Sequence, residues 1–94
     1  MNESQFQKKL IDEIKSRFPG SIVLKTDANT IQGFPDLLIL WKTRWAALEC
    51  KRDAAASMRP NQEYYIHLLN EMSFASVIFP EVKDEVLDAM ERSL

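Results

Sequence analysis

The chain has only one cysteine, Cys50, and only one histidine, His67, among its 94 residues. A single cysteine cannot form a disulfide within the chain, which fits a reducing, cytosolic environment. No cluster of Cys and His residues has the spacing of a structural zinc site, so we expect no such site. His67 falls within a predicted helix, where a structural role is favoured over a catalytic one. These scarcities argue against a domain stabilised by disulfides or zinc.

Long hydrophobic runs are also missing. No apolar segment approaches the ~20 residues of a membrane-spanning helix, and the N-terminal MNESQFQKK lacks the hydrophobic region of a secretory signal. We therefore expect a cytoplasmic protein without membrane contacts. The length suffices for one small domain, residues 1–94, and the composition of 46% hydrophobic and 28% charged residues is ordinary for a globular protein.

An excess of basic residues is absent as well. The net charge is −2, whereas proteins that bind nucleic acid by electrostatics alone are usually basic. The charges are unevenly distributed, because the C-terminal segment collects acidic residues, namely Glu81, Asp84, Glu85, Asp88 and Glu91. Several basic residues lie near the candidate site or in predicted loops, namely Lys25, Lys42, Arg44, Lys51, Arg52 and Arg59. The net charge therefore does not exclude a nucleic-acid partner.

Hydrophobic periodicity predicts an alternating α/β domain. Helices are predicted at residues 2–18, 60–72 and 81–94, with Asn2 or Ser4 capping the first. Strands are predicted at residues 21–26, 37–41, 45–48 and 74–79. The return to a strand after the second helix indicates a parallel crossover, and hence a mixed four-stranded sheet flanked by helices.

The segment from Gly33 to Lys51, GFPDLLILWKTRWAALECK, holds the candidate site. Two short apolar runs flank Lys42-Thr43, which predicts a β-hairpin with a two-residue turn. Counting outward from that turn places Asp36 opposite Glu49, with Lys51 on the same side of the sheet as Glu49. Because the turn lacks an Asn-Gly or Asp-Gly signature, a loop of different length would change the opposing pair.

Two carboxylates directly opposite each other on neighbouring strands repel unless something compensates. A divalent cation is the obvious compensator, since Mg²⁺ takes oxygen ligands from one or two carboxylates together with water and substrate phosphate. Lys51 would then lie close enough to position a water or to stabilise charge on a phosphate. The alternative is structural: Asp36 caps a turn, while Glu49 and Lys51 form an exposed ion pair.

These residues resemble the PD-(D/E)XK nuclease motif. Gly33-Phe34-Pro35-Asp36, a strand, a short turn, a second strand and Glu49-Cys50-Lys51 follow in the order of that motif. The GxPD form and the following Gln62 are most similar to the VRR-NUC branch, in particular to its small stand-alone versions encoded by phages, which are related to Holliday-junction resolvases. The resemblance extends over nearly the whole chain and implies a restriction-endonuclease-like αβββαβα core.

The resemblance also implies roles for individual residues. Asp36 and Glu49 would hold Mg²⁺ or Mn²⁺, with the Cys50 backbone carbonyl and Glu3 as further ligands. Lys51 would orient or activate the attacking water, and Gln62 would complete the site. Without the resemblance, Glu3 is explained well as a carboxylate at the start of a helix that needs no other role. Gln62 would by default be a surface residue. The expected DNA contacts are Lys25, Arg52 and Arg59, the two arginines because their guanidinium groups can bind phosphate as a fork.

The expected function is a metal-dependent DNA endonuclease, by resemblance a homodimer that cuts branched DNA such as a four-way junction, in the cytosol of a bacterium or of a phage-infected host. One alternative is a nuclease acting on flaps, nicks or linear duplex in phage genome processing or restriction. Another is a DNA-binding module that keeps the fold without the chemistry. Trp41 and Trp45 are interpreted mainly as packing or dimer-contact residues.

Overall fold

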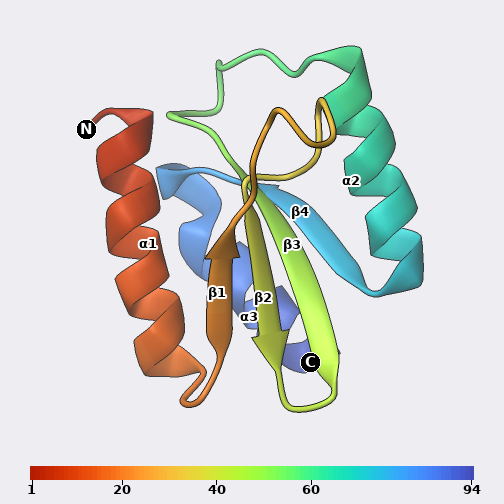
Figure 1. Cartoon of the computed structure of the whole chain (residues 1–94). Coiled ribbons are helices and arrows are strands. Elements are labelled where there is room, and N and C mark those ends of the chain that lie inside the picture. Colours follow the sequence, from red (N-terminus) through yellow and green to blue (C-terminus); the bar gives the residue numbers. More distant parts are fainter.

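A computed structural model describes all 94 residues (Figure 1). The chain forms three α-helices, one short 3₁₀ helix and four strands. In chain order they are α1 (Glu3–Arg17), β1 (Ile22–Lys25), β2 (Leu37–Trp41), β3 (Arg44–Cys50), α2 (Pro60–Met72), β4 (Phe74–Ile78), η1 (Pro80–Val82) and α3 (Lys83–Ser93). This order confirms the predicted succession of helix, three strands, helix, strand and helix.

The four strands form one mixed sheet in the order β1-β2-β3-β4. β1, β2 and β3 are antiparallel neighbours, and β4 runs parallel to β3 after the crossover through α2. Leu37 lies opposite Leu48 and Trp41 lies opposite Arg44, so the turn is Lys42-Thr43 and the predicted register is correct. Lys42 has a φ of 58°, in the left-handed region that residues other than glycine adopt uncommonly.

Helices cover both faces of the sheet. α1 and α3 pack on one face, where the main core contains 12 buried residues, among them Leu10, Ile39, Leu48 and Leu87. On the other face a smaller cluster joins Leu69 of α2 to the strands β3 and β4. Figure 1 shows α1 beside β1, α2 beside β4 and α3 behind the sheet. The part of the second face that belongs to β1 and β2 is left largely without a covering helix.

The N-terminus of α1 is held by a capping box. The Gln5 backbone N–H donates to Asn2 Oδ1 over 2.8 Å, and the Asn2 N–H donates to Gln5 Oε1 over 3.0 Å. Of the two predicted caps, Asn2 is therefore correct. These two bonds satisfy backbone donors that an α-helix leaves unpaired in its first turn, and they fix the end of α1 beside the candidate site.

Five of the seven predicted elements have boundaries that differ from the prediction by one or two residues; for example, β3 (Arg44–Cys50) is longer than the predicted 45–48. The last helix, predicted from residue 81, begins as a 3₁₀ turn at Pro80–Val82 and becomes α-helical only at Lys83. Pro80 has no N–H for the sheet and has the φ of a helical first turn, so the chain turns there before α3 begins. The first strand is also shorter than predicted, Ile22–Lys25.

No helix combines the length and hydrophobicity needed to cross a membrane.

Candidate functional site

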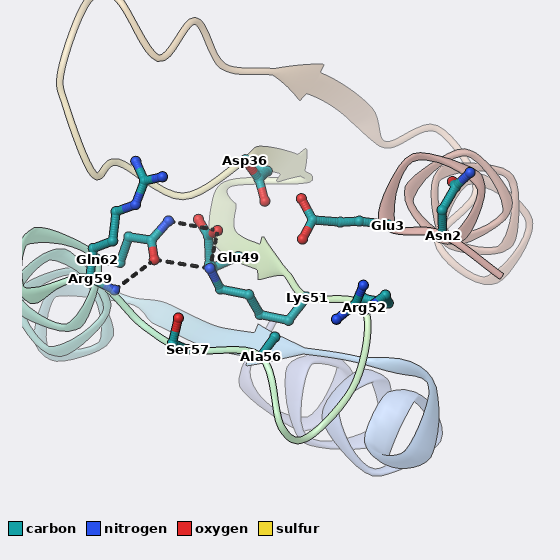
Figure 2. A pocket seen from close by; sticks show the side chains of 10 residues that line it. All are labelled: Asn2, Glu3, Asp36, Glu49, Lys51, Arg52, Ala56, Ser57, Arg59 and Gln62. Carbon is teal, nitrogen blue, oxygen red and sulfur yellow. Dashed lines mark hydrogen bonds and ion pairs between the residues drawn. The ribbon is translucent and has the colours of Figure 1, made fainter.

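A polar cavity of about 590 Å³ lies at the end of the sheet where β3 stops (Figure 2). It is bounded by the start of α1, the residue before β2, the end of β3, the β3–α2 connector and the start of α2. Only one of its ten lining residues is hydrophobic. The lining residues are Asn2, Glu3, Asp36, Glu49, Lys51, Arg52, Ala56, Ser57, Arg59 and Gln62. A cavity with this lining suits a charged or strongly polar ligand.

The β2–β3 hairpin places Asp36 beside Glu49. Asp36 directly precedes β2, and its carboxylate Oδ2 accepts a hydrogen bond of 2.8 Å from the Cys50 N–H. Its backbone is held from the other side, because its carbonyl accepts from the Thr26 N–H over 2.9 Å. The predicted juxtaposition of the two carboxylates is therefore confirmed, and Asp36 is fixed by contacts to both neighbouring strands.

Glu49 is buried, with only 3% of its surface exposed. Its Oε2 accepts a hydrogen bond of 3.1 Å from Gln62 Nε2 and lies 3.5 Å from Lys51 Nζ. Its Oε1 is buried and has no hydrogen-bond partner. A buried polar atom without a partner is costly, so this oxygen favours a partner in the cavity, which a water or a cation would supply, or a proton on the carboxyl group.

The environment of Glu49 strongly disfavours its charged form. Burial, and next the negative charge of Asp36, raise the pKa of Glu49 to about 8, although the Lys51 charge acts in the opposite direction. In the protein alone at neutral pH, the Glu49 carboxyl group therefore tends to carry a proton. A cation between the two carboxylates would favour the ionised form instead, because it supplies the positive charge that burial and Asp36 make necessary.

Lys51 is held between Glu49 and Gln62, and its side chain is only 11% exposed. Its Nζ donates a hydrogen bond of 2.9 Å to Gln62 Oε1. The same oxygen accepts from the Arg59 N–H over 3.0 Å, so the first turn of α2 fixes the position of the amine. The alternative in which Glu49 and Lys51 form an exposed pair is therefore wrong.

Gln62 contacts both Glu49 and Lys51, as the dashed lines in Figure 2 show. From its own sequence position it would be an ordinary surface residue, and only the motif resemblance marked it as functional. The structure places it in the first turn of α2, half-buried against the end of β3. Gln62 thereby links α2 to Glu49 and Lys51 at the end of β3, a contact that the hairpin alone does not make.

Glu3 reaches the cavity from the first turn of α1, and in Figure 2 its carboxylate points toward Asp36 and Glu49. No group of three or more His, Cys, Asp or Glu side chains is close enough together to hold a metal ion by itself. Mg²⁺, however, is commonly bound by one or two carboxylates with waters and substrate phosphates. The donors Asp36 and Glu49, with the unpartnered Glu49 oxygen, fit such a cation.

The other predicted site residues are distributed unevenly. Arg52 and Arg59 line the cavity and are exposed, although Arg52 Nε also lies 3.3 Å from Asp53. Lys25 lines no cavity, because it is opposite Leu37, which faces the main core, and cross-strand partners share a face. The Cys50 side chain is buried in that core, where burial raises the pKa of its thiol to about 12.

Three lining residues, Asn2, Ala56 and Ser57, are not among the predicted site residues. Asn2 is predicted only as a helix cap, and Ala56 and Ser57 lie in the connector between β3 and α2. No local pattern marks these residues, because they reach the cavity through the packing of α1 and of the connector against the sheet.

No protein-family model matches this chain, and no curated protein matches it either. Function must therefore be inferred from the geometry of the cavity and from the order of the motif residues along the chain.

Proposed function

We propose that the protein is a Mg²⁺- or Mn²⁺-dependent DNA endonuclease that hydrolyses phosphodiester bonds. The observation that carries this proposal is the buried Glu49 carboxyl group beside Asp36, whose Oε2 lies 3.5 Å from Lys51 Nζ and whose Oε1 has no hydrogen-bond partner. Without a cation the pair avoids repulsion by keeping a proton on Glu49, whereas a cation would let both groups be ionised and would give the Glu49 oxygen a partner. The resemblance to the PD-(D/E)XK motif supports the same chemistry, and with it a restriction-endonuclease-like fold.

Asp36 and Glu49 would hold the cation, with Glu3 and the Cys50 carbonyl as further ligands. When bound, such a cation lowers the pKa of water and stabilises negative charge on a phosphate group. The hydrogen bond from the Cys50 N–H keeps Asp36 oriented, and Gln62 keeps Glu49 oriented. These partners restrict the carboxylates in the way that outer hydrogen bonds usually restrict metal ligands.

In the proposed mechanism Lys51 positions the attacking water or stabilises negative charge on the phosphate. A lysine ammonium has three N–H donors. In this site Gln62 Oε1 and Glu49 Oε2 are acceptors for two of them. The remaining N–H is free for the attacking water or for a phosphate oxygen. Because its partners fix the amine before substrate binds, Lys51 needs little rearrangement to act on developing charge.

The substrate that suits this cavity is a nucleic acid backbone. The rim carries the exposed Arg52 and Arg59, and a guanidinium group can bind two phosphate oxygens at once. By resemblance the DNA is branched, for example a four-way junction. The alternative of cleavage at flaps, nicks or linear duplex uses the same site. A binding module without chemistry is less well supported, because DNA binding alone does not require an unpartnered buried carboxylate oxygen.

Labelled DNA of defined structure tests this proposal. The purified protein would be incubated with four-way, flap, nicked and linear DNA in Mg²⁺, in Mn²⁺ and in EDTA. We expect cleavage only with a divalent cation, and fastest cleavage of the four-way junction. Equal cutting of all substrates would remove the junction assignment and favour a general nuclease. Absence of cleavage with every substrate and cation would overturn the proposed function.

A homodimer is also proposed, and an uncovered apolar surface supports it. On the second face of the sheet Ile22 lies opposite Leu40, and Leu24 lies opposite Leu38. Ile22, Leu24 and Leu40 are 55%, 45% and 37% exposed. Beside them is a shallow cavity of about 310 Å³ lined only by hydrophobic residues, namely Phe34, Leu38, Leu40, Trp45 and Leu69. Contiguous apolar surface of this kind marks an interaction site.

Replacement of both Leu24 and Leu40 by lysine should convert the proposed dimer to a monomer. The double variant Leu24→Lys/Leu40→Lys places two charges within the apolar surface, where a second copy would have to bury them. Sedimentation velocity at matched concentrations would measure the oligomeric state. Met72→Lys, which charges an exposed apolar residue at the end of α2, is the control and should sediment as the unmodified protein does. A double variant that remains dimeric would show that the interface lies elsewhere.

A further inference from the structure

A second cavity of about 360 Å³ adjoins the first. It lies between the loop before β2 and the N-terminus of α2 and is lined by Ala28, Gln32, Gly33, Phe34, Asp36, Arg59, Pro60, Asn61 and Gln62. Asp36, Arg59 and Gln62 line both cavities. The two cavities therefore meet at the proposed reaction centre, and a polynucleotide chain bound there has a way onward through the second.

The walls of the second cavity are held together by a close backbone contact. Gly33 has a φ of +87°, and a Cβ added there would lie 2.5 Å from the Cβ of Asn61. Only glycine permits this approach of the loop to α2. Phe34, the next residue, packs against Tyr65 of α2 with ring centroids 5.8 Å apart. The loop and the helix thus form a preformed slot whose width depends on Gly33.

The chemistry of the second cavity differs from that of the first. Apart from Asp36, which it shares with the first, it contains no carboxylate and no lysine. Its distinctive polar groups are the exposed side-chain amides of Gln32 and Asn61, which form no hydrogen bonds with the rest of the protein. An amide offers both a donor and an acceptor, the combination that pairs with the edge of a nucleobase. The neighbouring Phe34 and Pro60 offer apolar surface to the base itself.

Arg59 lies at the boundary of the two cavities. It is exposed and forms no ion pair with an acidic side chain. Its contacts with Gln62 are made by the backbone, because its N–H donates to Gln62 Oε1 and its carbonyl accepts from the Gln62 N–H. In Figure 2 its guanidinium group points away from Glu49 and Lys51, toward the loop before β2. A phosphate that links a nucleotide in the second cavity to the reaction centre would therefore pass the guanidinium group.

We propose that the second cavity binds one unpaired nucleobase, that of the nucleotide next to the phosphate that is cut. This inference rests on the proposed nuclease function and adds a basis for substrate selection. In this proposal a single base enters the slot between the loop and the N-terminus of α2, so it must leave the duplex. Extrusion costs least where a base is already unpaired. The cavity would thereby favour DNA with a branch, bulge or mismatch over continuous duplex.

The test compares three labelled duplexes that differ at one nucleotide next to the mapped cleavage position: fully paired, mismatched, and mismatched with the base removed. With Mg²⁺ we expect the mismatched duplex to be cut about tenfold faster than the paired one, and the abasic duplex to lose this advantage. In Gln32→Ala/Asn61→Ala the ratio of mismatched to paired rates should fall toward one. Asn29→Ala is the matched control. Asn29 has an exposed side-chain amide in the same loop as Gln32, but it does not line the cavity.

The outcomes separate this inference from the proposed function. Equal cutting of all three duplexes by the unmodified protein, or an unchanged ratio in the Gln32/Asn61 double variant, would overturn the base-binding cavity and leave the nuclease intact. A falling ratio in the Asn29 variant as well would overturn it too, because the effect would then belong to the loop in general. Failure to cut any DNA would overturn the nuclease function itself.

Discussion

Replacement of Asp36 by asparagine should reduce Mg²⁺-dependent DNA cleavage by more than about 100-fold. Loss of hydrogen-bond partners behind a metal ligand commonly lowers affinity or activity by ~10–100-fold, and Asp36 is proposed as a ligand itself. The neutral amide removes one of the two negative charges that would hold the cation. Initial rates on a labelled four-way junction, measured over a range of Mg²⁺ concentrations, check this prediction.

Asparagine is the informative substitution at this position because Asp36 also has a structural role. Its Oδ2 accepts the hydrogen bond of the Cys50 N–H, and an asparagine Oδ1 can accept the same bond. Asp36→Ala would leave that N–H unpaired at a cost of ~1–3 kcal/mol. The alanine variant would therefore confound loss of the cation with loss of stability.

Asp12→Asn serves as the matched control for Asp36→Asn. Asp12 is exposed in the middle of α1 and does not line a cavity, so its substitution should leave cleavage unchanged. Thermal unfolding followed by circular dichroism would establish that both variants are folded. Undiminished cleavage by a folded Asp36→Asn variant would contradict the proposed mechanism.

In the metal-free protein, Glu49→Gln should remove a pH dependence of stability. Because the folded pKa of Glu49 is raised to about 8 from an ordinary value of 4.5, between these values the folded protein keeps a proton that the unfolded chain has lost. The free energy of unfolding should therefore fall as pH rises from about 5 to 8, by at most ~1.4 kcal/mol per pH unit. The stabilisation is complete below the unfolded pKa and is lost above the folded one.

Addition of a divalent cation should reverse this loss. Ca²⁺ binds oxygen ligands as Mg²⁺ does, and it should raise the melting temperature of the unmodified protein more at pH 8 than at pH 6, because at pH 6 the proton competes for Glu49. Glu49→Gln should melt at a higher temperature than the unmodified protein at pH 8 without metal and should show little response to Ca²⁺. Differential scanning calorimetry at the two pH values measures both effects.

Glu81→Gln is the matched control for Glu49→Gln, since Glu81 is exposed and forms no ion pair. It should retain both the decline of stability with pH and the response to Ca²⁺. A Glu49→Gln variant that still responds fully to Ca²⁺ would place the cation elsewhere. Unchanged pH dependence in that variant would show that Glu49 is not the titrating group.

The order of elements and the hairpin register could be predicted because both depend on local patterns. Alternation of apolar residues on either side of Lys42-Thr43 determines which residues pair, and the observed pairing of Leu37 with Leu48 confirms it. The same periodicity, with Pro60 at a helix start, located α2 correctly at Pro60–Met72. Hydrogen bonding between neighbours in the chain dominates such features, so the nearby residues suffice to predict them.

Other features depend on contacts between distant segments. The position of Lys25 away from the cavities follows from its pairing with Leu37. Gln62 became a site residue only because the crossover brings α2 against the end of β3, where it meets both Glu49 and Lys51. Neither its residue type nor its neighbours in the chain indicate that contact.

The sequence by itself determined the succession of helices and strands, the pairing of β2 with β3, and the placement of Asp36 next to Glu49. Only the tertiary structure decided how deeply Glu49 is buried, that one of its oxygens has no partner, and that a second cavity opens beside Gly33 and Asn61. The reason is physical: strand pairing follows the alternation of side chains along the chain, whereas burial and cavity shape depend on how α1, α2 and the loops pack around the sheet.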